Sequence, residues 1–374
     1  MVKIDIGDQS EVIEHNLAEL AAYISKCKRA VVVAGAGISC SGGIPDFRSS
    51  DGLYNLVKKK HPDVVLKGAE LFDATLFRDP NRTKCFYTFM AELKALVTTA
   101  KPTPTHRFLQ NMQEDGRILR LYTQNIDDLE AAANLEAVQL HGTMAKVKCT
   151  LCTSSYDFTE QHEKAFRSGE PPLCPDCENK GVIREAAGKR QLAMGTLRPS
   201  IVLYNEDHPD SEKIGKIQCS DIKRRPDMLI VLGTSLKIPG LKKFVKLAAR
   251  AVRDSKYGCT VLVNKTSPTK EWDAVFDYQI LGDTDTWVEI MDKMMNSRPT
   301  VTAAWARINQ RLSRKREHEE EDEKENRVGN VRAKRKTQQK TAATPKGQTT
   351  LQGYRVSKRS SIAAVASIPT KKHR

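Results

Sequence analysis

A glycine-rich loop near the start of the chain has the composition of a phosphate site. The apolar run Ala30–Val33 predicts a buried parallel strand. It is followed by Gly35, Ala36, Gly37, Ile38 and Ser39. Closely spaced glycines at a strand end let backbone N–H groups approach a phosphate, and a helix that begins there adds the positive end of its dipole. The loop therefore predicts a site for a dinucleotide.

The same loop continues with residues that hydride transfer does not need. A rigid turn, an acid, an aromatic ring and a base come from Pro45, Asp46, Phe47 and Arg48. An ordinary hydride-transfer enzyme continues its helix at this point. The loop therefore indicates a different reaction of the bound dinucleotide.

Polar residues also follow two other strand-like runs. The segment Thr123–Asp127 follows Ile118–Tyr122, and His141 follows residues 138–140. In a doubly wound sheet, loops at the carboxyl ends of strands form the ligand crevice. Amides and an acid there suit a ribose and a carboxamide, and a histidine there is a candidate general base. The alternatives are a helix-capping turn and a structural histidine.

Three further segments carry weaker signals. Gly233, Thr234 and Ser235 follow a predicted strand and are candidate phosphate or ribose contacts, although this is also an ordinary turn sequence. Asn264 lies at another strand end. The segment Arg198–Glu206 reads as an edge strand, which Pro199 permits at its start, and such a strand can template an added peptide strand.

Four of the nine cysteines form two tight pairs, Cys149-x2-Cys152 and Cys174-x2-Cys177, separated by 21 residues. Two such pairs complete a tetrahedral zinc site, and four thiolates leave no open position, so the metal is expected to be structural. A DNA-reading zinc module is the alternative, but acids are interleaved with its basic residues.

The hydrophobic pattern predicts an α/β fold with a doubly wound parallel sheet. Strands are expected at 30–33, 118–122, 228–232 and 260–263, and helices at 10–28 and 241–252. The predicted parts are the first part of a dinucleotide-binding domain at 1–145 with a helical insertion at 50–115, a zinc module at 146–193, the second part of that domain at 194–296 and a disordered tail at 297–374.

The positive charge is concentrated in this tail. Residues 301–374 hold 19 Lys or Arg and 7 Asp or Glu, whereas residues 1–300 hold 42 and 39. A basic tail favours nucleic acid or acidic protein surfaces, or serves only solubility or import. No apolar run approaches a membrane span, and the absence of a secretory signal favours a reducing, intracellular compartment.

Taken in order, these motifs resemble the sirtuins, the NAD-dependent protein deacylases, over about residues 10–295. The resemblance implies a cleft that holds NAD and acetyl-lysine between a Rossmann-type domain and a zinc-bearing domain. The acetyl oxygen attacks the ribose carbon that carries nicotinamide, and His141 then acts as a base on a ribose hydroxyl. The products are free lysine, O-acetyl-ADP-ribose and nicotinamide.

The resemblance also implies residue roles. His141 and Asn125 are expected to be catalytic. Expected NAD contacts are Gly35, Ala36, Gly37, Ile38, Ser39, Pro45, Asp46, Phe47, Arg48, Gln124, Asn125, Ile126, Asp127, Gly233, Thr234, Ser235, Asn264 and Thr284. Expected substrate contacts are Val202, Tyr204, Asn205, Glu206, Leu236 and Lys237.

Two positions depart from the family pattern. Asp128 stands where a small residue is usual, and its carboxylate either faces solvent or alters the charge of the cleft. Asn205 stands where glycine is usual. Because Asn takes positive φ more readily than most residues, we expect the turn at Asn205 to survive.

Three runs, Ser39–Gly43, Leu203–Tyr204 and Glu206–Pro209, together with the long basic tail, resemble the fungal nuclear branch, whose members deacetylate histone three and protect genome stability. This predicts an acetylated protein substrate, a histone, and a nuclear location. In the tail, 332–336 resembles an import signal. Residues 348–354 partly resemble a peptide that docks on the replication sliding clamp, with Arg355 in place of a second aromatic residue.

Other functions remain open at this stage. A sirtuin-type enzyme with another acyl or ADP-ribosyl preference shares the same motifs. A Rossmann oxidoreductase is disfavoured because Cys40 occupies the third fingerprint position. A non-catalytic, chromatin-binding zinc protein would use the basic tail alone.

Overall fold

A computed structural model describes residues 1–8, 10–46, 52–60, 68–314 and 317. Residues Met1–Gln310 form one compact unit. No helix within the described ranges has both the length and the hydropathy of a membrane span.

Seven parallel strands form the main sheet, in the order β1-β10-β9-β8-β2-β3-β4. Their bounds are β1 Val2–Asp5, β2 Ala30–Ala34, β3 Ile118–Thr123, β4 Ala137–Gln139, β8 Met228–Leu232, β9 Cys259–Asn264 and β10 Tyr278–Leu281. The four strands predicted from apolar runs are confirmed as β2, β3, β8 and β9. Because β2 pairs with β3 on one edge and β8 on the other, the strand order reverses there, and ligand crevices form at such points.

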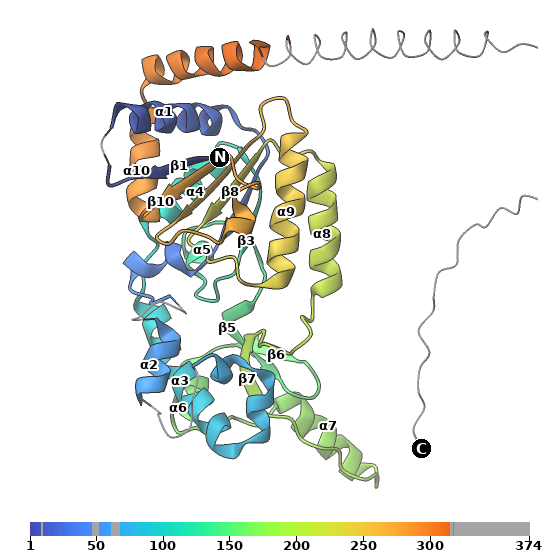
Figure 1. Cartoon of the computed structure of the whole chain (residues 1–374). Helices are drawn as coiled ribbons and strands as arrows, with labels where there is room; N and C mark the ends of the chain where they lie inside the picture. The colour runs from blue at the N-terminus through green and yellow to red at the C-terminus, as the bar shows by residue number, and fades with distance from the viewer. Residues whose placement is uncertain (9, 47–51, 61–67, 315–316, 318–374) are drawn as a thin grey trace, which may run out of the picture. The chain divides into compact units, whose positions relative to one another are not determined.

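Helices cover both faces of this sheet (Figure 1). On one face lie α1 Glu11–Lys26, α4 Pro104–Glu114 and α10 Thr284–Met295, and α10 contacts both of the others. On the other lie α8 Ser211–Lys223 and α9 Pro239–Arg253. Alternate residues of β2 and β8 are buried together with the apolar stripe of α9, as the period of two along a strand requires. The prediction of a doubly wound sheet is confirmed.

A second, antiparallel sheet has the order β6-β5-β7. Its strands are β5 Gly142–Cys149, β6 Ser155–Asp157 and β7 Leu197–Ile201, with helices α6 Glu160–Arg167 and α7 Pro175–Ala186 beside them. As predicted, β7 is an edge strand, but it ends at Ile201; beyond it, Tyr204 forms an isolated parallel bridge with Asp73.

The expected helical insertion divides between two cores. Its segments are α2 Leu53–Lys60, the 3₁₀ turns η3 Gly68–Phe72 and η4 Ala74–Arg78, α3 Pro80–Thr99 and α4. Phe86 and Met90 of α3 are buried in one cluster with Val147 and Phe166 of the cysteine-bearing segment. Phe108 of α4 instead packs edge-on against a tryptophan of α10. The helical insertion and the cysteine module, residues 146–193, therefore share a core that their local sequence patterns do not predict.

Two expectations need correction. No α-helix begins at the glycine loop: two short 3₁₀ turns follow, η1 Ala36–Ile38 and η2 Cys40–Gly42, and Gly43 ends the second at φ 98°. Residues 298–314, expected in the disordered tail, form a helix. Ala304 and Ile308 are buried, because apolar residues recur there at helical spacing. The rest of the tail lies outside the described residues.

Candidate functional site

A cavity of about 800 Å³ opens at the carboxyl ends of the main strands and reaches β7. It brings together these predicted residues: Ala36, Gly37, Asp46, Gln124, Asn125, Ile126, His141, Val202, Tyr204, Asn205, Glu206, Gly233, Thr234, Ser235, Lys237, Asn264 and Thr284. The ends of β3, β8, β9 and β10, the glycine loop and a candidate peptide-binding strand thus border one space, large enough for a dinucleotide-sized ligand.

The glycines of the loop permit close packing of two backbones. The Gly37 N–H donates to the carbonyl oxygen of Gly233 at 2.9 Å, and the Gly35 N–H donates to that of Leu232 at 2.9 Å. A Cβ on Gly37 would lie 2.6 Å from the Gly233 Cα. Both glycine N–H groups are therefore used within the protein, and the expected donation from the glycines to a phosphate is not what requires them here.

Asn125 lines the cavity and is almost fully buried, with 2% of its surface exposed. Its Nδ2 donates to Ser39 Oγ at 3.3 Å and to Glu130 Oε1 at 3.4 Å. Its Oδ1 is buried and has no hydrogen-bond partner among the described residues. A buried acceptor without a partner is costly unless a ligand supplies a donor, so the position suits an N–H or O–H of a bound molecule.

Two buried carboxyl groups, those of Asp127 and Glu130, follow Asn125 closely in the sequence. Burial raises the pKa of Glu130 to about 7, and the neighbouring charge of Asp127 adds to the rise. Burial also raises the pKa of Asp127, against hydrogen bonds from Leu129 and Ser39 that lower it. Glu130 Oε1 accepts from Thr123 Oγ1 at 2.5 Å. Glu130 thus holds the Asn125 side chain directly, and Asp127 holds the following backbone through the Leu129 N–H.

His141 lies in the connection between β4 and β5 and lines the cavity. Its Nδ1 is 2.8 Å from the carbonyl oxygen of Gln124. Since a carbonyl oxygen accepts, Nδ1 carries the hydrogen of the neutral ring, and Nε2 has the lone pair that a general base needs. The backbone oxygen of His141 also accepts from the N–H of Val202, the residue directly after β7, at 2.9 Å.

The turn after β7 is held by its own side chains. Asn205 takes φ 59°, as expected for a residue in place of glycine, and its Nδ2 donates to Asp73 Oδ2 at 2.7 Å. Glu206 accepts from Lys148 Nζ at 3.0 Å and pairs with Arg198. Although burial opposes it, the hydrogen bond and charge of Arg198, with Lys148, lower the pKa of Glu206.

Some predicted residues do not line the cavity. Gly35, Ile38, Ser39, Pro45, Asp127 and Leu236 are outside the lining. Leu236 lies in the turn after β8 at φ 50°, and this turn points its side chain into the core that it shares with α9 rather than into the cavity. Ser39 and Asp127 reach the site through Asn125 and its loop. Phe47 and Arg48 lie outside the described residues.

Sequence reasoning missed several lining residues. They are Cys40, Phe72, Ile201, Leu203, Ile238, Lys265, Thr266, Ser267, Pro268, Thr269, Gly282 and Asp283. The run 265–269 directly follows Asn264 at the end of β9, so the strand-end rule could have found it. Phe72 comes from the helical insertion, and nothing in its local sequence indicates the cavity.

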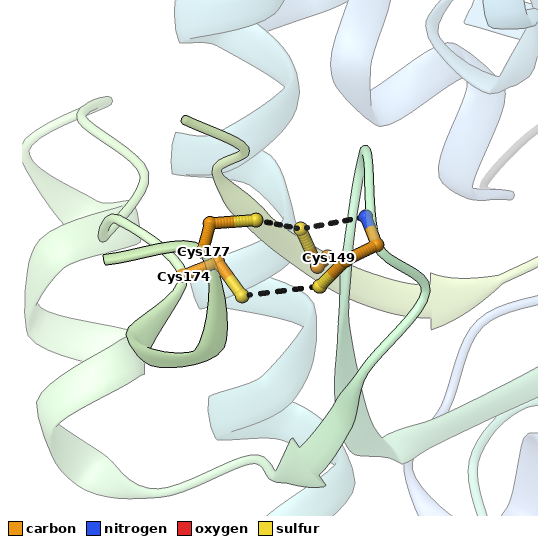
Figure 2. Close-up of side chains that lie close together, drawn as sticks. Cys149, Cys174 and Cys177 are labelled. Atoms are coloured by element: carbon orange, nitrogen blue, oxygen red, sulfur yellow. Dashed lines mark hydrogen bonds between the residues drawn. The ribbon is translucent and has the colours of Figure 1, made fainter. Parts of the chain in front are cut away.

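The four paired cysteines converge, as Figure 2 shows for Cys149, Cys174 and Cys177. Their sulfur atoms all lie within 4.8 Å of one another. The Cys149–Cys177 and Cys152–Cys174 sulfurs are 3.7 and 3.5 Å apart. Sulfur ligands of a tetrahedral zinc with ~2.3 Å bonds are ~3.8 Å apart, so the site fits Zn²⁺. Because the four thiolates fill a tetrahedral zinc site and the described residues add no fifth donor to the cluster, the metal is structural.

The family profile matches the part of the chain that builds this cavity. The Sir2 family matches residues 35–240. The chain belongs to the Sir2 family of NAD-dependent deacetylases. The family resemblance expected from the spaced motifs is thereby confirmed, and with it the NAD dependence of the site and its four-cysteine zinc centre.

Fungal Sir2-family proteins are among the similar curated proteins. The NAD-dependent histone deacetylase HST3 of Candida albicans is 40% identical over 320 residues, covering 78% of this chain and 66% of the relative. HST3 of Saccharomyces cerevisiae is 41% identical over 305 residues, covering 75% and 68%. The NAD-dependent protein deacetylase hst4 of Schizosaccharomyces pombe is 42% identical over 284 residues, covering 72% and 67%. The chain thus spans about two thirds of these relatives' length.

Solved Sir2 structures share the fold. A Sir2 structure with a deacetylated p53 peptide and 3′-O-acetyl ADP-ribose is 26% identical, with a TM-score of 0.58, and covers 74% of this chain and 97% of that one. A second, described as the structural basis for the mechanism and regulation of Sir2 enzymes, is 27% identical with a TM-score of 0.58, covering 76% and 100%.

Proposed function

We propose that this Sir2-family protein is an NAD-dependent protein-lysine deacetylase that acts on a histone. The single observation that carries the chemistry is the pairing of two groups in one cavity. His141 presents a ring whose Nδ1 is held by a carbonyl, and Asn125 presents a buried oxygen that lacks a partner among the described residues. The first suits proton abstraction, and the second suits recognition of a polar ligand group.

NAD supplies the bond to nicotinamide whose cleavage drives the reaction. In the proposed roles, Asn125 Oδ1 accepts a hydrogen bond from the nicotinamide end, while Ser39 and Glu130 keep its amide from rotating. Asp127 holds the loop through the Leu129 N–H. His141 Nε2 takes the proton from a ribose hydroxyl of the co-substrate.

Further NAD contacts are assigned by position on the cavity wall. Ala36, Gly37 and Asp46 lie on the first loop, and Gln124 and Ile126 lie on the second. Gly233, Thr234, Ser235, Asn264 and Thr284 lie at the ends of the neighbouring strands and at the start of α10. Gln124 Nε2 donates to Thr234 Oγ1 at 2.9 Å, so two of these loops are already joined.

The acetylated strand is assigned to the groove at β7. Val202, Tyr204, Asn205 and Lys237 border the cavity there. An extended peptide placed beside this edge would gain main-chain hydrogen bonds, the usual source of affinity when a strand is added to a sheet. Glu206 serves the groove by fixing its turn through Arg198 and Lys148.

The activity test measures nicotinamide release from the purified full-length protein. Release is expected when NAD and an acetylated histone peptide are both present, and not with either alone. His141→Ala should lower steady-state nicotinamide release, and with it turnover, by about 10²–10⁴-fold. Steady-state release that is undiminished in this variant would overturn the assignment, and reduction of NAD to NADH would favour an oxidoreductase.

The histone target and a nuclear location rest on the names of the relatives, which are histone deacetylases. A panel of acetylated histone peptides and whole nucleosomes tests the target. The import-like run 332–336 and the clamp-like segment 348–354 lie outside the described residues. Deletion of 332–336 with a fluorescent fusion tests import, and a clamp pull-down with residues 340–360, compared with its Leu351→Ala/Tyr354→Ala variant, tests docking.

A further inference from the structure

Asp128 has an unusual environment for a residue beside an active-site loop. It occupies the left-handed region, at φ 58° and ψ 19°, which L residues with a side chain rarely adopt. Glycine takes this conformation without strain, and a small residue is what the family resemblance leads us to expect here. The carboxylate must therefore make contacts that justify its place.

Those contacts are to the two residues that flank His141. Asp128 Oδ1 accepts from Gln139 Nε2 at 2.9 Å and from Thr143 Oγ1 at 2.5 Å. Gln139 is two residues before His141, and Thr143 is two residues after it. One carboxylate oxygen thus joins the end of β4 to the start of β5, across the short connection that carries His141.

An ordinary structural reading of Asp128, as a helix cap, does not fit. Asp128 is the residue before the short helix α5 Leu129–Ala132, but its side chain makes no capping bond. The N–H of Leu129 donates to Asp127 Oδ1 instead. The second oxygen, Asp128 Oδ2, is buried without a partner in the described part of the chain. The bonds to Gln139 and Thr143 are therefore what the carboxylate provides.

We infer that Asp128 is a positioning residue, which fixes the backbone on both sides of the proposed base His141. The ring is oriented by the Gln124 carbonyl, and the backbone of His141 is joined to Val202. Asp128 adds the constraint that keeps the β4–β5 connection in place when ligands bind. A misplaced catalytic group can cost up to about 10²-fold in rate, so loss of this constraint should slow the step that uses the base.

The inference rests on the proposed function, and its test uses the full-length protein. Asp128→Gly removes the carboxylate that joins Gln139 to Thr143, here called the clamp, and it also removes the strain of a left-handed backbone. The melting temperature of this variant should therefore be equal to or higher than that of the wild type. Its kcat for deacetylation should nevertheless fall about tenfold, with little change in KM for NAD. Exchange of labelled nicotinamide into NAD, which precedes the step of the base, should be affected less than deacetylation.

Two matched variants sharpen the test. Asp128→Asn keeps an acceptor oxygen and should retain kcat within about threefold. Asn134→Gly likewise replaces a residue of positive φ, at 56°. Asn134 is exposed and lies outside the segment Gln139–Thr143 that carries His141. It should leave both rates unchanged, which controls for relief of backbone strain.

The outcomes separate the two claims. If the wild type shows no NAD-dependent deacetylation, the proposed function fails. If the wild type is active and Asp128→Gly keeps its kcat, or if exchange, deacetylation and melting temperature all fall together, the positioning role is overturned. An Asp128→Asn variant as slow as Asp128→Gly would also overturn it, because charge rather than the clamp would then be responsible.

Discussion

The Nδ1 atom of His141 lies 2.8 Å from the carbonyl oxygen of Gln124, the residue next to Asn125. The loop that carries Asn125 therefore also sets which ring nitrogen of His141 is free of hydrogen. In the proposed function, this short stretch of backbone couples binding at Asn125 to proton transfer at His141. In the proposed function, His141 acts as the base in a step that follows release of nicotinamide, which makes the two steps separable by experiment.

We expect His141→Ala to lower kcat for deacetylation by about 10²–10⁴-fold, the usual contribution of a positioned general base. Exchange of nicotinamide should persist, because it does not need that proton transfer. Both rates are measured on the same protein with labelled nicotinamide and an acetylated peptide. His15→Ala, at a histidine of α1 with 48% of its side chain exposed, is the control and should leave both unchanged. Equal loss of both rates in His141→Ala would contradict the assigned role.

Local sequence patterns predicted the main sheet well. The runs that became β2, β3, β8 and β9 are continuous and apolar, because strands of a parallel sheet are buried on both faces. Their ends could then be assigned to one crevice from topology alone. The metal site was equally predictable, since the spacing of cysteine pairs is itself the geometric requirement.

Contacts between distant segments were not predictable in this way. The packing of α3 against the cysteine module depends on side chains far apart in sequence. Phe72 belongs to the same core and lines the cavity only because of that packing. The sequence left open whether the Asp128 carboxylate faces solvent or alters the charge of the cleft, and its bonds to Gln139 and Thr143 could not be foreseen because neither residue stands in a recognisable pattern. The helix at 298–314 was hidden by the charged composition around it.

At Asn205, backbone conformation and substrate binding should be separable. Asn205→Gly keeps φ 59° accessible and loses only the bond to Asp73, so stability should change by less than about 1 kcal/mol and KM for peptide should change little. Asn205→Ala loses the bond and strains the turn, at a cost of about 1–2 kcal/mol, and should raise KM for peptide. Chemical denaturation and peptide titration measure the two effects. Equal behaviour of the two variants would show that the positive φ is unimportant.

Removal of the zinc ligands should disrupt more than the cysteine module. Cys149 and Cys174 are buried in the core that α3 shares, and β5 begins next to His141. Cys177→Ser should therefore lose zinc, lower the melting temperature and abolish deacetylation. Zinc content is measured by elemental analysis, with one ion per chain expected in the wild type. Cys219→Ser, at an exposed cysteine of α8, is the control. A zinc-free Cys177→Ser protein with full activity would refute this dependence.

Glu130 should make stability depend on pH in the neutral range. Its pKa is about 7 in the folded protein, against an ordinary value of 4.5, because of burial and then the charge of Asp127. Between these values the folded state binds more protons than the unfolded state. The free energy of unfolding therefore falls as pH rises through this window, by up to about 3 kcal/mol, and levels off above it.

The matching experiment compares the wild type with Glu130→Gln by chemical denaturation at pH 5 and pH 8. Gln keeps an oxygen that accepts from Thr123 Oγ1 and from Asn125 Nδ2, but it cannot ionise. The stability of Glu130→Gln relative to the wild type should therefore increase between pH 5 and pH 8. Because Asn125 keeps its partner, KM for NAD at pH 6 should stay within about threefold of the wild type. If the difference in free energy of unfolding between the two proteins did not change with pH, Glu130 would titrate at its ordinary pKa in the folded protein, and this prediction would be wrong.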